Sequence, residues 1–234
     1  MVDRAALEMR YAARHRRFES STLRTMPKNK NTAARIRRHF KRVDPRIHAI
    51  LEDMTLEPLK SARGTNGYFL KLCRDIIYQQ LAGKAAAAIH RRFIELFPSR
   101  NPSPDEVLKV PPKTLRACGL SEQKVRYLCD LAEKASKKEL AFHTFRALGD
   151  EAIIAELTKV KGIGRWTAEM FLIFTLGRED VFSFGDLGLA KGLEMLYGKR
   201  RVNSERKVRD ITERWAPYRS YGSFAVWYVK DRER

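Results

Sequence analysis

Apolar residues recur along most of this chain at intervals of three and four positions, which is the spacing of one face of an α-helix. The pattern becomes regular near residue 34 and continues almost to the C-terminus, in segments separated by glycines, prolines and polar capping residues. Runs in which apolar and polar residues alternate, as in half-buried strands, are missing from the sequence. The pattern therefore predicts an all-α fold.

The punctuation of this pattern predicts the individual helices. Asp44-Pro45 ends one helix and begins the next, and residues 64–67 are expected to form a loop. Polar residues before apolar segments are the expected N-caps: Ser103, Ser121, Asp150, Asp186 and Ser204. Among the clearest expected helices are residues 34–43, 68–80, 85–97, 187–197, 204–215 and 217–229.

Composition and charge limit the class of protein. Hydrophobic residues make up 44% of 234 positions, enough for a buried core, and no apolar run is long enough to span a bilayer or to form a signal peptide. The net charge of +19 indicates a polyanionic partner. Fourteen Lys or Arg residues against four Asp or Glu lie in residues 1–50. We expect residues 1–33 to be a basic, flexible extension that attracts phosphates without specificity, and residues 34–234 to be the folded domain.

Cysteine spacing argues against metal and disulfide chemistry. The three cysteines are scattered, with no CxxC pair and no histidine at the spacing of a zinc site. No cysteine follows Cys129, so a four-cysteine iron–sulfur cluster near the C-terminus is not expected.

The most informative stretch is residues 157–192, LTKVKGIGRWTAEMFLIFTLGREDVFSFGDLGLAKG. Gly162 and Gly164 permit a tight turn, and Ile163 between them can fix the turn to the core. Such a turn presents backbone N–H groups at the start of the next helix, beside Lys161 and Arg165, and so predicts a phosphate site.

Asp186 follows this buried helix and begins another. Its position alone is explained by N-capping. An ionised carboxylate at that point would also stabilise the oxocarbenium-like cation formed when a glycosidic bond breaks, and could orient the attacking water.

The hairpin, Trp166, the spacing and Asp186 together resemble the helix-hairpin-helix base-excision DNA glycosylases. GIGRWTA and DLGLAKG are most similar to the DNA-3-methyladenine glycosylase II (alkylpurine) family. The resemblance covers about residues 36–230, with the hairpin motif at 157–176 and the Asp loop at 177–192. It implies two helical subdomains with the active-site cleft between them, and Asp186 as the catalytic carboxylate.

The resemblance also assigns a lesion pocket. Trp166 and Trp227 would line it, with Tyr228 or Tyr221 assisting, although core packing explains buried aromatics equally well. Trp166 stands where strand-cleaving relatives carry a Schiff-base lysine, so a monofunctional enzyme is expected. Met170 stands where a relative has an aromatic residue, which leaves the substrate range open.

DNA contacts follow from the same resemblance. Backbone groups of Gly162, Ile163, Gly164 and Arg165 would hold phosphates, and Gln80 or Leu81 would fill the gap left by an extruded base. Carbonyl groups of Thr158 and Val160 could supply a structural monovalent cation site, and no other cofactor is expected.

The sequence therefore predicts a glycosylase that flips alkylated purines, of the 3-methyladenine and 7-methylguanine type, out of duplex DNA. Two alternatives stay open: a glycosylase of the same fold for uracil, hypoxanthine, ethenoadenine or a mismatch, and a non-catalytic helix-hairpin-helix DNA-binding module. The expected partner is double-stranded DNA carrying a damaged base. We expect an intracellular monomer that acts where DNA is found, without a membrane.

Overall fold

The computed structural model describes residues 30–62 and 64–232, and every regular element in these residues is helical. The described chain forms two compact units, one from Ser61–Leu176 and one from the segments up to Lys60 and from Gly177 onward. The expected basic extension lies mostly outside the described residues. Its last positions, 30–33, already belong to helix α2, Lys30–Val43. None of the described helices is long and apolar enough to cross a membrane.

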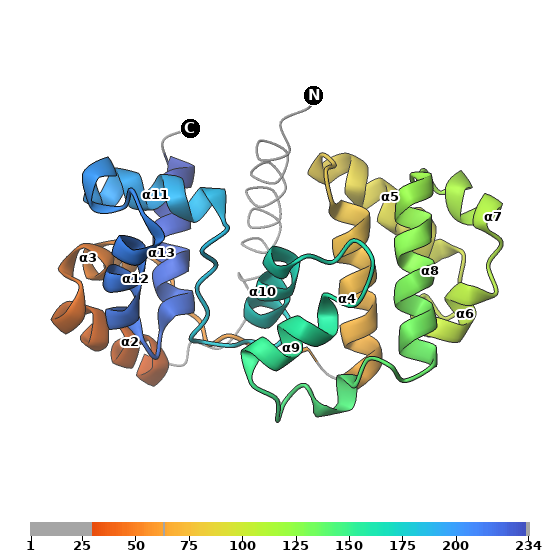
Figure 1. Ribbon diagram of the computed structural model, residues 1–234, viewed down its shortest axis with the longest axis horizontal. Helices are drawn as coiled ribbons and strands as arrows, with labels where there is room; N and C mark the ends of the chain where they lie inside the picture. Colours follow the sequence, from red (N-terminus) through yellow and green to blue (C-terminus); the bar gives the residue numbers. More distant parts are fainter. Residues whose placement is uncertain (1–29, 63, 233–234) are drawn as a thin grey trace. The chain divides into compact units, whose positions relative to one another are not determined.

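The first unit, unit 1, joins both ends of the described chain. It contains α2, α3 (Pro45–Asp53), α11 (Leu187–Tyr197), α12 (Glu205–Thr212) and α13 (Arg219–Arg232), with short 3₁₀ turns η2 (Lys199–Arg201) and η3 (Glu213–Trp215). Helix α11 packs across α13, and α3 packs against both α2 and α13 (Figure 1). Trp215, Tyr221, Trp227 and Phe40 are fully buried and form its aromatic core.

The second unit, unit 2, is the continuous segment between them. Its helices are α4 (Gly64–Tyr78), α5 (Gly83–Glu95), α6 (Pro104–Leu108), α7 (Pro112–Ala117), α8 (Glu122–Ser136), α9 (Asp150–Leu157) and α10 (Arg165–Phe174), with a 3₁₀ turn η1 (Phe142–Thr144). Helices α4 and α8 lie side by side (Figure 1). An edge-to-face cluster of Tyr68, Phe142, Phe145 and Phe171 fills the core beneath α10.

Most expected helix starts are confirmed, and two details are wrong. Ser103 forms a complete capping box with Glu106, and Ser121 and Ser204 cap α8 and α12. Residues 64–67, expected as a loop, are the first turn of α4, because the burial of Tyr68 and Phe69 outweighs the low helix propensity of glycine. The N-cap of α9 is Gly149, and Asp150 is its first residue.

Candidate functional site

The glycine-containing hairpin of unit 2 connects α9 to α10. Gly162 has φ +84°, whereas Gly164 has φ −92° and is the N-cap of α10. Ile163 between them is 4% exposed and anchors the turn in the core, as its sequence position predicts. Only the first glycine therefore needs the left-handed conformation, which residues with a Cβ atom rarely adopt.

The hairpin presents backbone N–H groups at the start of α10. Two are already bonded: the N–H of Ile163 donates to Val160 O at 3.1 Å, and that of Lys161 donates to Asp130 Oδ2 at 2.9 Å. No acceptor in the described part of the chain reaches the N–H groups of Gly162 and Gly164, and no side chain caps α10. The start of α10 therefore keeps donors and the positive end of a helix dipole for an anion.

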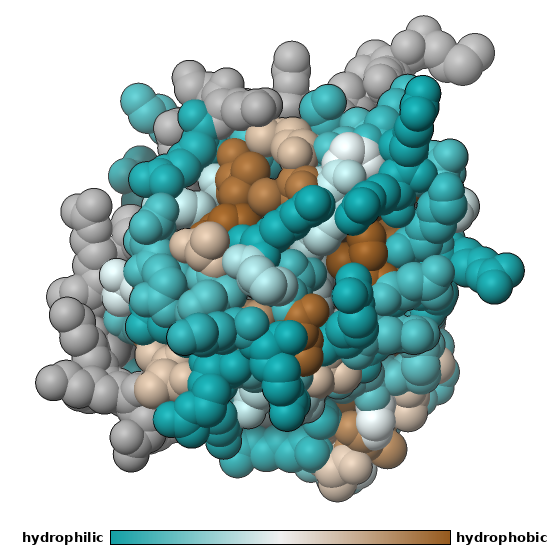
Figure 2. Space-filling view, turned by 90° about the vertical axis from the view of Figure 1, so that its left-hand side faces the viewer, coloured by the Kyte–Doolittle hydropathy of each residue, from teal (hydrophilic) through white to brown (hydrophobic). Residues whose placement is uncertain are grey.

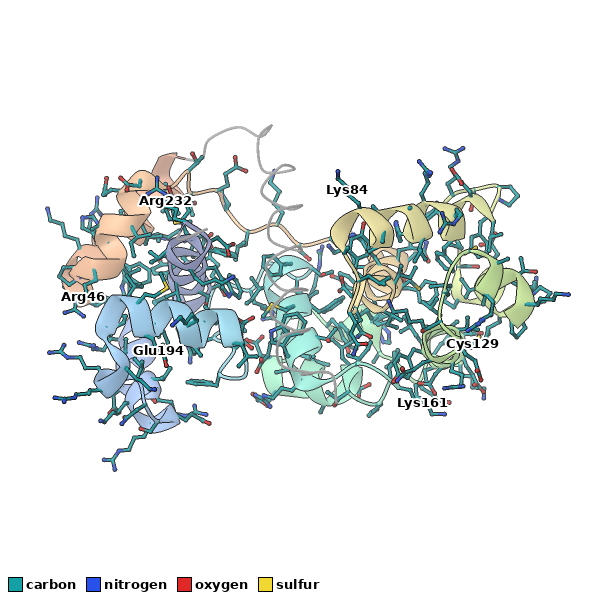
Figure 3. All side chains as sticks on the ribbon, turned by 90° about the horizontal axis from the view of Figure 1, so that it is seen from above. Arg46, Lys84, Cys129, Lys161, Glu194 and Arg232 are labelled. Atoms are coloured by element: carbon teal, nitrogen blue, oxygen red, sulfur yellow. The ribbon has the colours of Figure 1, made fainter. Side chains whose placement is uncertain are left out.

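One face of α8 holds this hairpin in place. Besides the Asp130 carboxylate, the ring of Tyr127 lies against Gly162, where an added Cβ atom would come within 2.1 Å of it. Figure 3 labels Lys161 close to Cys129, the neighbour of Asp130 on α8. Three positions apart on α8, Tyr127 and Asp130 share one helical face and fix the turn from below.

The same face of α8 also holds the turn between α4 and α5. Lys124 Nζ donates to the carbonyl oxygens of Ile77 and Gln79 at 2.6 and 2.7 Å, at the C-terminal end of α4. Burial lowers the pKa of this amine to about 8. Gln79 Nε2 in turn donates to Gly162 O at 2.8 Å, so the turn and the hairpin are directly connected.

The two residues expected to act as a wedge lie in that turn. Gln80 is exposed and has φ +58°, while Leu81 is partly exposed and its N–H donates to Tyr78 O. A non-glycine residue with positive φ is uncommon, and here it turns the side chain of Gln80 outward at the tip of the turn.

The charged side chains of the hairpin differ in their surroundings. The guanidinium of Arg165 bonds Glu151 through two nitrogens and Glu169 through Nε at 3.0 Å, which raises its pKa. Lys161 is mostly exposed, with Nζ 3.7 Å from Asp130. A phosphate at the hairpin would thus meet a loosely held lysine and an arginine already paired with carboxylates.

Trp166 and Met170 lie one helical turn apart at the start of α10, and both are partly exposed. The neighbouring positions Thr167, Ala168 and Phe171 are buried. Trp166 and Met170 therefore occupy the face of α10 that the unit 2 core leaves accessible.

Asp186 is the N-cap of α11 in unit 1 and is 1% exposed. Its Oδ1 accepts from the N–H of Leu189 at 2.8 Å and from the indole Nε1 of Trp227 at 3.0 Å. The capping role foreseen from sequence is confirmed. The tryptophan, 41 positions away, adds a second donor that fixes the carboxylate in one orientation.

Close helix packing brings these two residues together. Gly192 of α11 lies against α13, where an added Cβ atom would come within 2.6 Å of the Val226 carbonyl oxygen. The loop before Asp186 is tied to α13 as well, because Asp180 bonds Arg219 through both carboxylate oxygens at 2.8 and 2.9 Å. The N–H of Val181 donates to the buried Ser220 hydroxyl at 3.0 Å. Asp186 is thus held from both sides in the sequence.

The two tyrosines considered for the pocket have other contacts. The Tyr228 ring packs under the Arg232 guanidinium, 4.6 Å from its centroid. The Tyr221 hydroxyl is an acceptor for Leu59 N–H in the core of unit 1, and burial raises its pKa. Trp227 alone among these aromatics contacts Asp186 through a described hydrogen bond.

Comparison with known proteins agrees with this arrangement. Residues 73–217 match the HhH-GPD family, described as a superfamily of base excision DNA repair proteins. DNA-3-methyladenine glycosylase 1 of Schizosaccharomyces pombe is 36% identical over 165 residues, which are 67% of this chain and 70% of the relative.

The chain belongs to the HhH-GPD superfamily of base excision DNA repair proteins. Within it, the chain is a DNA glycosylase of the 3-methyladenine family, an enzyme class that hydrolyses N-glycosyl bonds.

Solved structures agree with the assignment to this superfamily. The crystal structure of a DNA-3-methyladenine glycosidase from Bacillus halodurans is 32% identical, with a TM-score of 0.72 over 82% of this chain and 87% of that one. The Schizosaccharomyces pombe 3-methyladenine DNA glycosylase in complex with abasic DNA is 30% identical, with a TM-score of 0.66 over 82% and 95%. The helix-hairpin-helix glycosylase fold expected from the motif is confirmed.

Sequence reasoning missed the residues of this HhH-GPD chain that position the hairpin. Lys124, Tyr127 and Asp130 recur every third position of α8, beside the apolar face that the periodicity revealed. A polar and aromatic stripe at that spacing is a signal that something packs there, but only the fold identifies the hairpin and the α4–α5 turn as its partners.

Replacing Trp227 with Phe should impair base release more than it impairs folding. The substitution removes the indole donor to a buried carboxylate, which costs about 1.5–3 kcal/mol of stability, and lets Asp186 shift, which slows release roughly 10- to 100-fold. Trp215→Phe is the matched control, since Trp215 Nε1 donates at 2.8 Å to Asp44, the N-cap of α3. The two variants should lose similar stability in thermal unfolding. Equal loss of activity in both would contradict a specific role for Trp227.

Asp130→Asn should lower the free energy of unfolding at neutral pH, with a difference that shrinks in acid. Burial opposes the charge of Asp130, but hydrogen bonds from Lys134 and from the Lys161 N–H outweigh it and hold the pKa below its ordinary 3.8. A lowered folded pKa stabilises the fold fully above the unfolded value, and this contribution is lost as pH falls through the folded pKa. Denaturant unfolding between about pH 3 and pH 7 measures this, and a difference independent of pH would count against it.

Proposed function

We propose that the enzyme removes alkylated purines of the 3-methyladenine and 7-methylguanine type from duplex DNA, leaving an abasic site in an intact strand. The observation that carries this proposal is Asp186, a buried carboxylate oriented by Leu189 N–H and Trp227 Nε1 in a chain of this glycosylase family. Such a carboxylate is positioned before the reaction begins, as electrostatic stabilisation of a transition state requires.

Asp186 supplies the negative charge for bond cleavage. As the bond between the base and the sugar breaks, positive charge develops on the anomeric carbon, and a fixed carboxylate stabilises it more in the transition state than in the substrate. The same carboxylate orients or deprotonates the water that completes hydrolysis. A purine alkylated at N3 or N7 carries a positive charge and leaves as a neutral base, so no general acid is needed.

The position of Trp166 supports a hydrolytic enzyme without strand cleavage. Strand-cleaving relatives use a lysine amine at this point of the hairpin to attack the sugar, and an indole cannot do so. The accessible indole face instead attracts a cationic base by about 0.5–2 kcal/mol. Met170, one turn further along α10, would add a polarisable side chain to the same wall.

The hairpin and the α4–α5 turn are the proposed DNA contacts. The N–H groups of Gly162 and Gly164 at the start of α10 would bind a backbone phosphate without reading sequence. Gln80 or Leu81 would enter the space left by the extruded nucleotide and offset part of the unstacking energy of a few kcal/mol.

The end of α9 is the proposed position of a structural monovalent cation. Thr158 O receives no hydrogen bond from a donor in residues 30–62 or 64–232, and Val160 O receives one, from Ile163. Both therefore retain lone pairs, the ligands that a hard cation prefers. A cation bound there would add positive charge beside the phosphate site.

A panel of duplexes tests the substrate class. Each would carry one damaged or mismatched base: 3-methyladenine, 7-methylguanine, ethenoadenine, hypoxanthine or uracil. The proposal expects free base from the two methylated duplexes, with strand breaks only after alkali. Exclusive release of uracil would refute the alkylpurine proposal, and strand breakage without alkali would refute a purely hydrolytic enzyme.

A further inference from the structure

Unit 1 carries a second candidate site, a hollow of about 500 Å³ that the glycosylase chemistry does not use. It lies between the start of α3, the C-terminal end of α11, the η2 turn and one face of α12. Asp186 caps the opposite end of α11, a helix of 11 residues and therefore about 16 Å long. The hollow is thus separate from the catalytic carboxylate.

The lining of this hollow is strongly basic. Its cations are Arg46, Arg200, Arg201, Lys207 and Arg214, against the carboxylates of Asp44 and Asp210. Asp44 is buried and committed to the fold, because its Oδ2 accepts from Tyr197 at 2.5 Å and from Trp215 at 2.8 Å. Asp210 is the single exposed carboxylate among the described lining residues.

Two of the cations hold the wall of the hollow together. Arg46 donates to the carbonyl of Leu196 at 3.0 Å and lies over the Tyr197 ring, which places it at the side of α3 nearest α11 (Figure 3). Lys207 Nζ donates to Arg200 O at 2.9 Å and so connects α12 to the η2 turn. These bonds to neutral groups leave both positive charges uncompensated.

The other three cations have no described carboxylate partner. Arg200, Arg201 and Arg214 are exposed and form no ion pair with any residue in 30–62 or 64–232. By contrast, Arg209 on the same helix α12 pairs with Glu205. Seen from the side on which α3 and α11 lie in Figure 1, hydrophilic side chains predominate on the surface (Figure 2). Like charges gathered around one concavity repel one another, and a bound anion would relieve this repulsion.

We propose that this hollow binds a phosphate-bearing anion, either consecutive phosphates of a DNA backbone or a free oligophosphate. Guanidinium groups present paired donors that match phosphate oxygens. The size of the hollow and its several cations fit an anion with more than one phosphate better than a single ion. The site would bind independently of Asp186 and of any damaged base.

The test compares two triple variants of the full chain. Arg200→Gln, Arg201→Gln and Arg214→Gln together remove the unpaired cations of the hollow. Arg38→Gln, Arg42→Gln and Arg206→Gln remove three exposed arginines of the same unit that do not line it, so the change in net charge is identical. Calorimetry with inorganic tripolyphosphate, and binding of undamaged duplex DNA at several salt concentrations, are the two measurements.

The hollow variant should bind tripolyphosphate about tenfold or more weakly than the parent, and the control should change by less than about threefold. If DNA phosphates are the ligand, the hollow variant alone should also lose about two to three units of salt slope. Loss of tripolyphosphate binding with an unchanged DNA slope would assign the site to a free oligophosphate. Equal weakening by both variants in both measurements would overturn the proposal. Thermal unfolding verifies that both variants fold, and Arg214→Gln alone repeats the comparison with a smaller change.

Discussion

Asp186→Asn should reduce base release on the order of 10³-fold while leaving the fold and DNA binding intact. The amide oxygen of asparagine can still accept the hydrogen bonds that Asp186 Oδ1 receives from Leu189 N–H and Trp227 Nε1. The cap of α11 and the packing of the indole are therefore preserved, and the main loss is the negative charge. Single-turnover release of base from a methylated duplex measures the effect.

Asp53→Asn is the matched control for this substitution. Asp53 is an exposed residue at the end of α3 in the same unit, and the chemical change is identical. The control should release base at the parental rate. If Asp186→Asn also retained parental activity, Asp186 would be a capping residue only and the chemistry would need another group.

Gly162→Ala should destabilise the hairpin and weaken binding to damaged and undamaged DNA alike. The added methyl group would come within 2.1 Å of the Tyr127 ring, and φ of +84° is unfavourable for any residue with a Cβ atom. Strain in the left-handed region and overpacking together cost about 2–4 kcal/mol. Relief of this strain would move the N–H groups at the start of α10, so DNA affinity should fall about tenfold or more.

Gly164→Ala separates this effect from the loss of a glycine as such. Gly164 has φ −92° and open space where a Cβ atom would lie, so the variant should unfold at nearly the parental temperature. Thermal unfolding of both variants, followed by DNA titration, makes the comparison. A Gly162→Ala variant as stable as the parent would show that the turn does not require a left-handed residue.

Local signals in the sequence predict much of the fold because they act over a few residues. The helix 187–197 is found with its expected bounds, since Asp186 caps its start and Gly198 ends it. The Asp44-Pro45 break and the capping box at Ser103 are local for the same reason. Residues 64–67 were mispredicted because tertiary burial of the following aromatic residues, which no local rule contains, decides that turn.

The candidate site is predicted only as far as it is contiguous in sequence. The hairpin and Asp186 lie within one stretch of 36 residues that can be recognised as a motif. The contact of Trp227 with Asp186 depends on α11 and α13 packing closely at Gly192, and the support from Tyr127 and Asp130 depends on α8 lying under the hairpin. Long-range packing of this kind leaves no periodic or local signal.

The most direct test of the account is single-turnover incubation of the purified protein with duplex DNA methylated at adenine N3. The account predicts stoichiometric free 3-methyladenine, identified by chromatography, and a strand that stays whole until alkali is added. Tight binding of the duplex without any released base would contradict the assignment of Asp186 as the group that cleaves the N-glycosidic bond of alkylated purines.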